Sequence, residues 1–326
     1  KVTLRHRLVQ AASAAGSGWS DSYGTTGSDD TDGGAGGAGA GAGGDDAPAG
    51  TAAQISYCAW SPDDSRLLTC GNDKRRTNVV KMWDSKTGAL LRTFAHHSDS
   101  VTAVAWMPGG THFFSGSLDK KLIMWDANSG AVHEILEGKR VNDLAVSADG
   151  NTLVSIVSES SIQVLRLDTR SQASRDLGDN CTSLSMSADG RSILVNLSAQ
   201  EVHLYDLARS VDVLDEKAPP VMCYRGQKQG RYVIRSCFGG RDESFVVSGS
   251  EDSQVYVWNR ATGELLDVLA GHSGTVNAVA WNPADPYQFA SASDDKTIRI
   301  WSTRGKVMEA MSASADEDSP SAGVGA

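Results

Sequence analysis

The chain has 326 residues, 40% of them hydrophobic, and a formal net charge of −10. Such an acidic chain lacks the basic surface that general binding to nucleic acid or to an anionic membrane requires. Nothing in it resembles a signal peptide or an apolar run of about 18 residues, so we expect a cytoplasmic or nuclear protein without membrane insertion.

The first 53 residues contain two different kinds of sequence. Residues 2–8 (VTLRHRL) alternate between apolar and polar side chains, which predicts one exposed strand within residues 1–10. Residues 11–53 consist mainly of Gly, Ala, Ser and Asp, with no Lys or Arg. This composition cannot bury enough apolar surface to offset chain entropy, so we expect a disordered loop. Because the chain starts at Lys1 in the middle of a pattern, we expect it to be a fragment.

A repeated pattern occupies residues 54–311, with a period close to 40–45 residues. Each copy has short alternating runs separated by turn residues, which indicates antiparallel strands. The interval before the fifth copy is longer and predicts an insertion around residues 212–230. The six copies are aligned by the residue that ends their third run: Trp83, Trp125, Leu165, Tyr205, Trp258 and Trp301.

The last copy shows the pattern most clearly. Gly271-His272 precedes an alternating run, and a Ser-rich run, an acidic turn and a strand ending at Trp301 follow. This order resembles a WD40 repeat, which forms one four-stranded blade of a β-propeller. The resemblance implies an all-β propeller with six near-complete blades plus one orphan strand at residues 1–10, a truncated form of a seven-bladed ring. Residues 312–326 are expected to be a disordered tail.

The resemblance also implies a hydrogen-bonded set of His, Ser, Asp and Trp side chains. The Ser oxygen can accept from the indole N–H while the imidazole joins Ser to Asp. Because the indole occupies the Ser oxygen, we expect a structural role and no Ser–His–Asp catalysis. In the middle copies, which have Leu165 and Tyr205 at the Trp position, we expect lower local stability. Two copies carry the full set, His97, Ser115, Asp119 and Trp125 in one and His272, Ser291, Asp295 and Trp301 in the other.

The chain contains no recognisable cofactor or metal motif. The five cysteines show no C-x-x-C pair and no zinc-ligand spacing, so we expect reduced thiols, no metal and no cofactor. Binding through loops is the usual work of a propeller. A rim of loop residues is therefore the expected docking surface for a peptide, and its carboxylates favour a basic one. This rim comprises Asn72, Ser100, Leu118, Arg140, Tyr232, Glu251, Thr275 and Asp294.

Several runs are more particular than the repeat itself: YVIRSCFGG at residues 232–240, SGSEDSQVYVW at 248–258, and LLTCGN at 67–72. With these runs the chain resembles the WD repeat-containing protein 26 family, especially its plant-type members. The resemblance implies a non-catalytic subunit of the GID/CTLH E3 ubiquitin ligase that binds other ligase subunits and recruits substrates or regulators. The family self-associates through N-terminal LisH and CTLH segments, which are not in this chain.

Two other functions stay open. One is a signalling scaffold similar to a G-protein β subunit, and the other is a cullin-4 substrate receptor. The cullin-4 adaptor motif is W-D-x-R, and the copies beginning at Trp83 and Trp125 both lack its Arg. Helices of the LisH and CTLH type upstream would favour the ligase subunit, whereas an upstream coiled coil would favour the scaffold.

Overall fold

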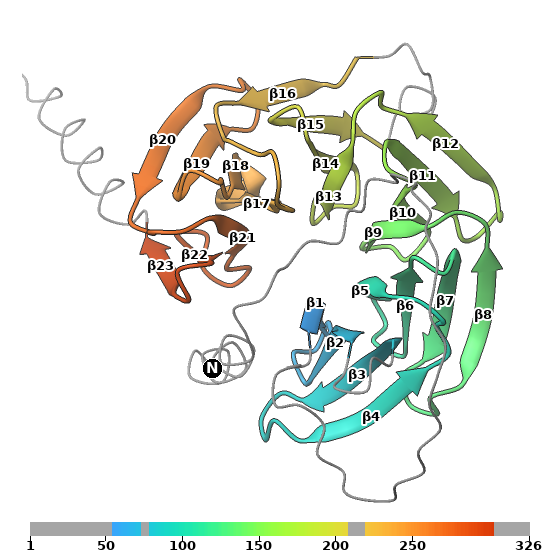
Figure 1. The fold of residues 1–326 in the computed structure, drawn as a ribbon. Helices are drawn as coiled ribbons and strands as arrows, with labels where there is room; N and C mark the ends of the chain where they lie inside the picture. The colour runs from blue at the N-terminus through green and yellow to red at the C-terminus, as the bar shows by residue number, and fades with distance from the viewer. Residues whose placement is uncertain (1–53, 73–77, 208–218, 303–326) are drawn as a thin grey trace, which may run out of the picture.

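The computed structural model describes residues 54–72, 78–207 and 219–302. In this part of the chain the structure is all-β, and its six sheets stand around a common axis as the blades of a propeller (Figure 1). The fold confirms the expected propeller with six blades. The strand expected at residues 1–10, the loop at 11–53 and the tail at 312–326 lie outside the described residues. No described helix is long and apolar enough to cross a membrane.

Each blade is an antiparallel sheet whose strands follow one another in chain order from the axis outward. Blade 1 contains β1 (Gln54–Trp60), β2 (Arg66–Asn72), β3 (Asn78–Asp84) and β4 (Leu90–Ala95). Blade 2 contains β5 (Val101–Trp106), β6 (His112–Ser117), β7 (Lys121–Asp126) and β8 (Val132–Glu137). Blade 3 contains β9 (Val141–Val146), β10 (Thr152–Val157), β11 (Ser161–Arg166) and β12 (Gln172–Asp176).

The second half of the ring repeats this order with two differences. Blade 4 contains β13 (Cys181–Met186), β14 (Ser192–Leu197), β15 (Glu201–Asp206) and β16 (Met222–Arg225). Blade 5 contains β17 (Ser236–Gly239), a short 3₁₀ turn η1 (Arg241–Glu243), β18 (Phe245–Ser248), β19 (Gln254–Asn259) and β20 (Leu265–Ala270). Blade 6 has three described strands, β21 (Val276–Trp281), β22 (Gln288–Ser293) and β23 (Ile298–Ser302).

The strand-ending residues occupy equivalent places in all six blades. Trp125 pairs with Phe113, the second residue of the neighbouring strand, and Trp301 pairs in the same way with Phe289. In the degenerate blades Leu165 stands opposite Leu153 by the same register. The repeat deduced from the sequence is therefore the structural repeat, including the blades that lack tryptophan.

The expected insertion needs a correction. Residues 212–230 are not all additional sequence, because Met222–Arg225 within them form β16, the outer strand of blade 4. This strand pairs antiparallel with β15, and Tyr224, opposite Val202, is fully buried. The periodicity was difficult to read here because β16 has only four residues.

A short polar turn joins the first two strands in blades 1, 3 and 4. In blade 1 the Ser61 hydroxyl donates to Asp63 Oδ1 at 2.6 Å, and the same Oγ accepts the N–H of Arg66 at 2.9 Å. Ser147 and Asp149 repeat the first bond in blade 3. These bonds satisfy the polar groups of the tight turn and end the inner strand cleanly.

The hydrophobic core lies between consecutive blades, in the faces that they present to each other. Between blades 1 and 2, Phe94 packs edge-on against Phe113 and Trp125, with ring centroids 4.8 and 5.4 Å away. Blades 5 and 6 also approach each other closely, because a Cβ at Gly249 would lie 2.1 Å from the backbone oxygen of Val276. Each blade is thus stabilised mainly by its neighbours, as in other repeat folds.

Blade 6 and blade 1 stand apart in the ring (Figure 1). Apolar side chains at this place are solvent-exposed: Ile298 is 36% and Ile300 56% exposed in β23, and Ile55 is 43% exposed in β1. A further blade would cover such side chains. The seventh blade of the parent ring stays a prediction.

At the axis one charged pair joins distant blades. Arg235, which immediately precedes β17, donates through Nη1 to Asp143 Oδ2 of β9 at 2.7 Å. Its guanidinium carbon also lies 4.2 Å from the ring centroid of Tyr57 in β1. Asp143 is fully buried and accepts two backbone N–H groups as well, from Leu144 and Leu184 at 2.9 Å each. Blades 1, 3, 4 and 5 therefore meet at this pair.

Candidate functional site

The expected rim residues lie at one end of the blades. The start of an inner strand and the end of the second strand are adjacent, since Val101 pairs with Ser117 and Val276 pairs with Ser293. Rim residues therefore occupy either the turn before an inner strand or the turn after a second strand. Ser100, Arg140, Tyr232 and Thr275 are in the first group, and Leu118, Glu251 and Asp294 are in the second; Asn72 ends β2, and its side chain lies outside the described residues.

Backbone hydrogen bonds bring members of the two groups together within a blade. The N–H of Leu118 donates to the carbonyl of Ser100 at 3.0 Å in blade 2. The N–H of Asp294 donates to the carbonyl of Thr275 at 2.9 Å in blade 6. The rim of these blades is therefore a set of paired turns, which hold their side chains on a rigid base.

The His–Ser–Asp–Trp side chains lie directly beneath these turns. In blade 2 His97 Nδ1 lies 2.9 Å from Asp119 Oδ2, and His97 Nε2 lies 2.7 Å from Ser115 Oγ. The indole of Trp125 donates to the same Ser115 Oγ at 2.8 Å. Asp119 follows Leu118 in the sequence, so the bonds that hold Asp119 also position this rim residue.

Blade 6 contains the same arrangement. His272 lies 2.9 Å from Asp295 Oδ2 and 2.7 Å from Ser291 Oγ, which accepts the indole N–H of Trp301 at 2.8 Å. Ser115 and Ser291 are 0% and 1% exposed. A buried hydroxyl that is already bonded to an indole is poorly placed to attack a substrate. The geometry suits a structural set.

In blades 1 and 5 the indole N–H of the strand-ending tryptophan has a different hydrogen-bond acceptor. Trp83 donates to Thr69 Oγ1 at 2.8 Å, and Trp258 donates to the backbone oxygen of Arg225 at 3.1 Å. Blade 5 instead holds its rim turn through Glu251. One of its oxygens, Oε1, accepts the N–H groups of Gly230 at 2.8 Å and of Tyr232 at 2.8 Å.

These hydrogen bonds engage the Glu251 carboxylate within the protein, so it is less available to a binding partner. Burial alone would raise the pKa of Glu251, but the N–H groups of Tyr232, Gly230 and Arg231 outweigh it and hold the pKa below its usual value. Its charge thus orders the loop before β17. Asp294, whose Oδ1 accepts from Asn277 Nδ2 at 2.5 Å, is the more exposed of the two rim carboxylates.

The buried imidazole of blade 2 is expected to make the stability of the protein pH-dependent. Burial lowers the pKa of His97 despite the bond to Asp119, so the folded protein favours the neutral ring. The unfolded chain takes up a proton near pH 6.5, which the folded protein resists. The free energy of unfolding should therefore fall as the pH is lowered below about 6.5.

Melting temperatures measured from about pH 8 to about pH 5.5 test this prediction. His97→Gln keeps a polar side chain without the titrating ring, and should flatten the pH dependence. His133→Gln, which replaces an exposed histidine on β8, is the matched control and should leave the pH dependence as in the wild type. Identical pH profiles for the two variants would contradict the assignment.

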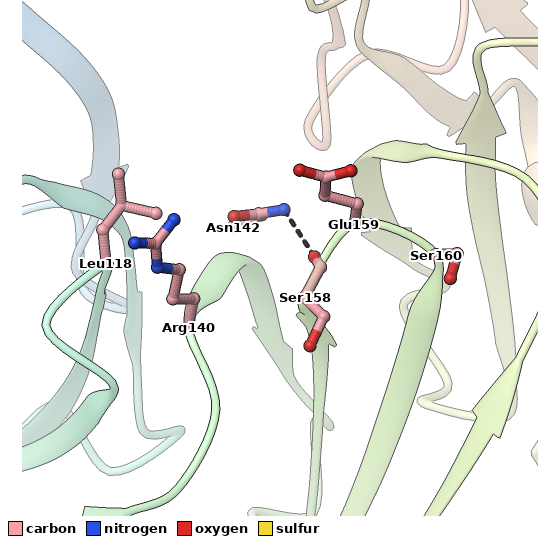
Figure 2. Close-up of a pocket in the computed structure, with 6 residues that line it drawn as sticks. All are labelled: Leu118, Arg140, Asn142, Ser158, Glu159 and Ser160. Carbon is pink, nitrogen blue, oxygen red and sulfur yellow. Dashed lines mark hydrogen bonds between the residues drawn. The ribbon is translucent and has the colours of Figure 1, made fainter. Parts of the chain in front are cut away.

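A pocket opens on the rim between blades 2 and 3 (Figure 2). Leu118 and Arg140 are on one side and Glu159 on the other, so the pocket offers an apolar, a positive and a negative group. Asn142 Nδ2 donates to the carbonyl of Ser158 at 2.7 Å and fixes the floor. The full lining is Leu118, Arg140, Asn142, Ser158, Glu159 and Ser160.

Sequence reasoning identified two of these residues and missed the other four. Leu118 and Arg140 follow from their place in the repeat. Glu159 occupies the position at which Asp119 stands in blade 2 and Asp295 in blade 6. Glu159 has a longer side chain than Asp, and its blade lacks the His that would bind a carboxylate at this position. These two features of the sequence could have predicted a carboxylate directed to solvent.

Comparison with known proteins agrees with this architecture. The family described as "WD domain, G-beta repeat" (WD40) matches residues 49–84, 88–126, 219–259 and 263–302. These four ranges end at or just after Trp83, Trp125, Trp258 and Trp301. The matched repeats are thus those with a strand-ending tryptophan, while the copies with Leu165 and Tyr205 diverge from the family pattern.

Three similar proteins cover most of the propeller. The chain is 45% identical over 254 residues to a WD repeat-containing protein WDS homolog of Arabidopsis thaliana (76% of this chain, 46% of the relative). It is 39% identical over 245 residues to a WD repeat-containing protein 26 homolog of the same plant (74% and 40%). It is 38% identical over 226 residues to GID complex subunit 7 of Schizosaccharomyces pombe (67% and 43%).

The chain spans less than half the length of each of these three relatives. By its fold, its repeats and these similarities, the chain belongs to the WD40-repeat β-propellers, in the family that includes the WD repeat-containing protein 26 homologs.

Proposed function

We propose that this propeller is a non-catalytic protein-binding subunit of a GID-type E3 ubiquitin ligase, where it recruits substrates or regulators through its rim. The similarity to GID complex subunit 7 carries the proposal, because it extends over two thirds of this chain. We expect the protein to reside in the cytoplasm, the nucleus or both. Self-association and attachment to the other subunits are assigned to segments outside this propeller.

The structural sets favour binding over catalysis. Both Ser–His–Asp arrangements are buried and each is completed by an indole donor. The rim instead presents turns that backbone hydrogen bonds pair in blades 2 and 6, and a pocket of mixed character between blades 2 and 3. Rigid loops with a few exposed polar and apolar groups are typical of peptide-docking surfaces.

The pocket between blades 2 and 3 is the proposed centre of recruitment. Arg140 is exposed and can pair with an acidic side chain, while the half-buried Leu118 beside it offers apolar contact. Asp294, on the rim of blade 6, suits a basic residue of the same partner. We therefore expect a peptide segment of mixed charge as the client.

Purification of the full-length protein with its bound partners tests the ligase assignment. We expect identified subunits of the GID-type ligase to co-purify with it. Recovery of G-protein signalling components without any ligase subunit would overturn the assignment and favour the signalling scaffold.

Charge reversal on the rim tests the recruiting pocket separately. In the full-length protein, Arg140→Glu should weaken binding of a client by at least about tenfold, or about 1.4 kcal/mol, with assembly of the ligase unchanged. Glu264→Arg, in an exposed turn at the opposite end of blade 5, is the control and should bind normally. Affinities measured for an identified client give the comparison, and equal affinities for both variants would contradict a rim site.

A further inference from the structure

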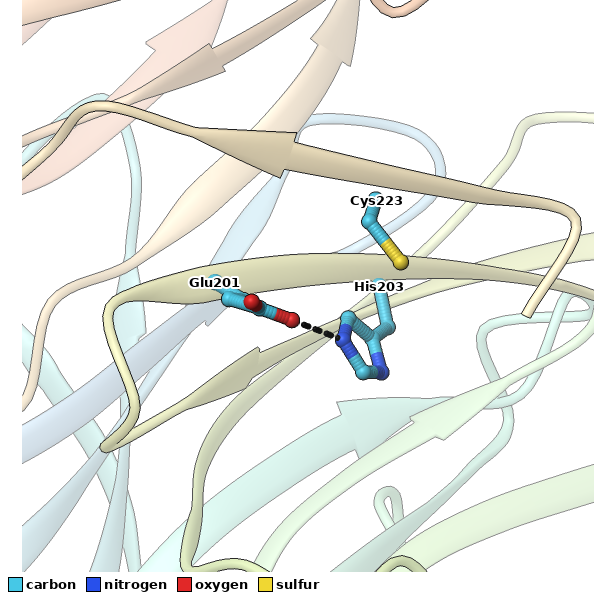
Figure 3. Close-up of side chains that lie close together, drawn as sticks. All are labelled: Glu201, His203 and Cys223. Carbon is cyan, nitrogen blue, oxygen red and sulfur yellow. Dashed lines mark hydrogen bonds and ion pairs between the residues drawn. The ribbon is translucent and has the colours of Figure 1, made fainter. Parts of the chain in front are cut away.

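Blade 4 contains a cluster of three metal-ligating side chains that is distinct from the rim. Glu201 and His203 lie two residues apart on β15, so they project from the same face of the strand. Cys223 stands directly opposite His203 on β16. Figure 3 shows the Cys223 sulfur directed toward the imidazole, with the Glu201 carboxylate on the other side of the ring.

We propose that Glu201, His203 and Cys223 bind a zinc ion. Their ligand atoms all lie within 4.8 Å of one another. In a tetrahedral site with Zn–S of about 2.3 Å and Zn–N of about 2.0–2.1 Å, sulfur and nitrogen are about 3.6 Å apart. Closing to that separation needs only side-chain rotation, because an antiparallel strand pair supplies all three residues and holds their backbones in place.

The donor set selects the metal. A thiolate, an imidazole and a carboxylate together suit Zn²⁺, whereas Mg²⁺ and Ca²⁺ prefer oxygen ligands. The thiolate and the carboxylate balance the two charges of the ion. Three protein ligands leave a fourth position, which we assign to water.

The surroundings of His203 already fix its ring. Nε2 lies 2.7 Å from Glu201 Oε2, and Nδ1 lies 3.1 Å from the hydroxyl of Tyr205. A tyrosine hydroxyl can donate or accept, so it can serve the ring both before and after Nε2 exchanges its proton for the metal. Such a hydrogen bond to the remote nitrogen is the usual support of a metal-bound histidine.

Glu201 is held in a comparable way. Arg225 Nε donates to Glu201 Oε1 at 2.7 Å and leaves Oε2 on the side of His203. The Glu201 and His203 side chains are 24% and 14% exposed, and Cys223 is half-buried. The cluster is thus open enough for an ion to enter and sheltered enough to hold it.

No metal is expected from the sequence, because its cysteines show neither a C-x-x-C pair nor zinc-ligand spacing. The Glu-x-His pair and its cysteine are separated by the long connection between β15 and β16. No short motif announces the cluster. Only pairing of these two strands brings Cys223 beside His203.

Cobalt spectroscopy of the purified chain tests the proposal. After removal of metals with a chelator, one equivalent of Co²⁺ should produce a thiolate-to-cobalt absorption in the near ultraviolet, and Zn²⁺ should abolish it. Cys223→Ser should eliminate this absorption. Cys58→Ser, which removes the exposed cysteine of β1, should retain it. Absence of the absorption in the wild type, or its persistence in Cys223→Ser, would overturn the site.

Two further measurements separate metal binding from a purely structural cluster. Tyr205→Phe removes the hydrogen bond to His203 Nδ1, and should weaken zinc affinity by about tenfold or more. In the unaltered protein, zinc should protect Cys223 from alkylation, as mapped by mass spectrometry, and leave the extent of Cys58 alkylation unchanged. Equal alkylation of Cys223 with and without zinc would contradict the proposal even if a variant failed to fold.

Discussion

Replacement of Arg235 by methionine is expected to lower the free energy of unfolding by about 3–5 kcal/mol. Methionine keeps most of the stem but leaves Asp143, a fully buried carboxylate, without its cation. The two backbone N–H groups that Asp143 accepts do not neutralise its charge. The loss should be large because blades 1, 3, 4 and 5 all meet at this pair.

A double-mutant cycle in denaturant melts isolates the pair. Asp143→Asn combined with Arg235→Met removes both charges and should be less destabilising than the sum of the single changes. Arg170→Met is the control, because Arg170 pairs with Glu134 at an exposed site, where an ion pair contributes about 1 kcal/mol or less. Similar losses in the free energy of unfolding for Arg235→Met and Arg170→Met would show that the axial pair stabilises the fold no more than an exposed ion pair does.

Truncation of Trp125 to alanine should cost about 3–5 kcal/mol. Trp125 is 2% exposed and packs against Phe94 and Phe113 in the core between blades 1 and 2. Its loss leaves a large cavity and also removes the indole donor from Ser115. Leu165→Ala at the equivalent place in blade 3 should cost less, about 2 kcal/mol, because a smaller side chain is removed.

Trp125→Phe separates the two contributions. It keeps an aromatic ring in the core but removes the N–H that donates to Ser115, and should cost about 1 kcal/mol for the hydrogen bond. Chemical denaturation of the three variants gives the comparison. Equal losses for Trp125→Ala and Leu165→Ala would contradict the expectation that the larger side chain contributes more to the core between blades.

The repeat could be predicted from the sequence because its residues recur at fixed spacing. The position of Trp301 relative to His272, Ser291 and Asp295 predicts which side chains can meet, since each lies at a fixed place in a four-stranded unit. The same register locates the rim turns. Local patterns of this kind are sufficient to predict the fold.

Contacts between residues far apart in the sequence could not be predicted in this way. Arg235 and Asp143 are 92 residues apart, and nothing in either local sequence marks the other. Glu251 shows the same limit, because its role depends on three N–H groups of a loop about 20 residues earlier. Turn position predicts that Glu251 lies on the rim, but not that its carboxylate is engaged there.

The middle blades illustrate how tertiary contacts can replace a missing pattern. Blades 3 and 4 lack the full His–Ser–Asp–Trp set, yet Asp143 of blade 3 accepts the N–H of Leu184 in blade 4. Blade 4 is joined in turn to blade 5, where Ser183 Oγ donates to the carbonyl of Ile234 at 2.8 Å. The lower stability of these blades stays a prediction, and these bonds act against it.

The Arg235–Asp143 salt bridge at the propeller axis also affects where a proposed client could bind. A guanidinium that is already neutralised by Asp143 and stacked on Tyr57 has little attraction left for an acidic ligand threading down the axis. In the proposed function, recognition therefore falls to the rim, where the turns can diverge in sequence without disturbing the Arg235–Asp143 pair. Related propellers could acquire new clients by exchanging those turns alone.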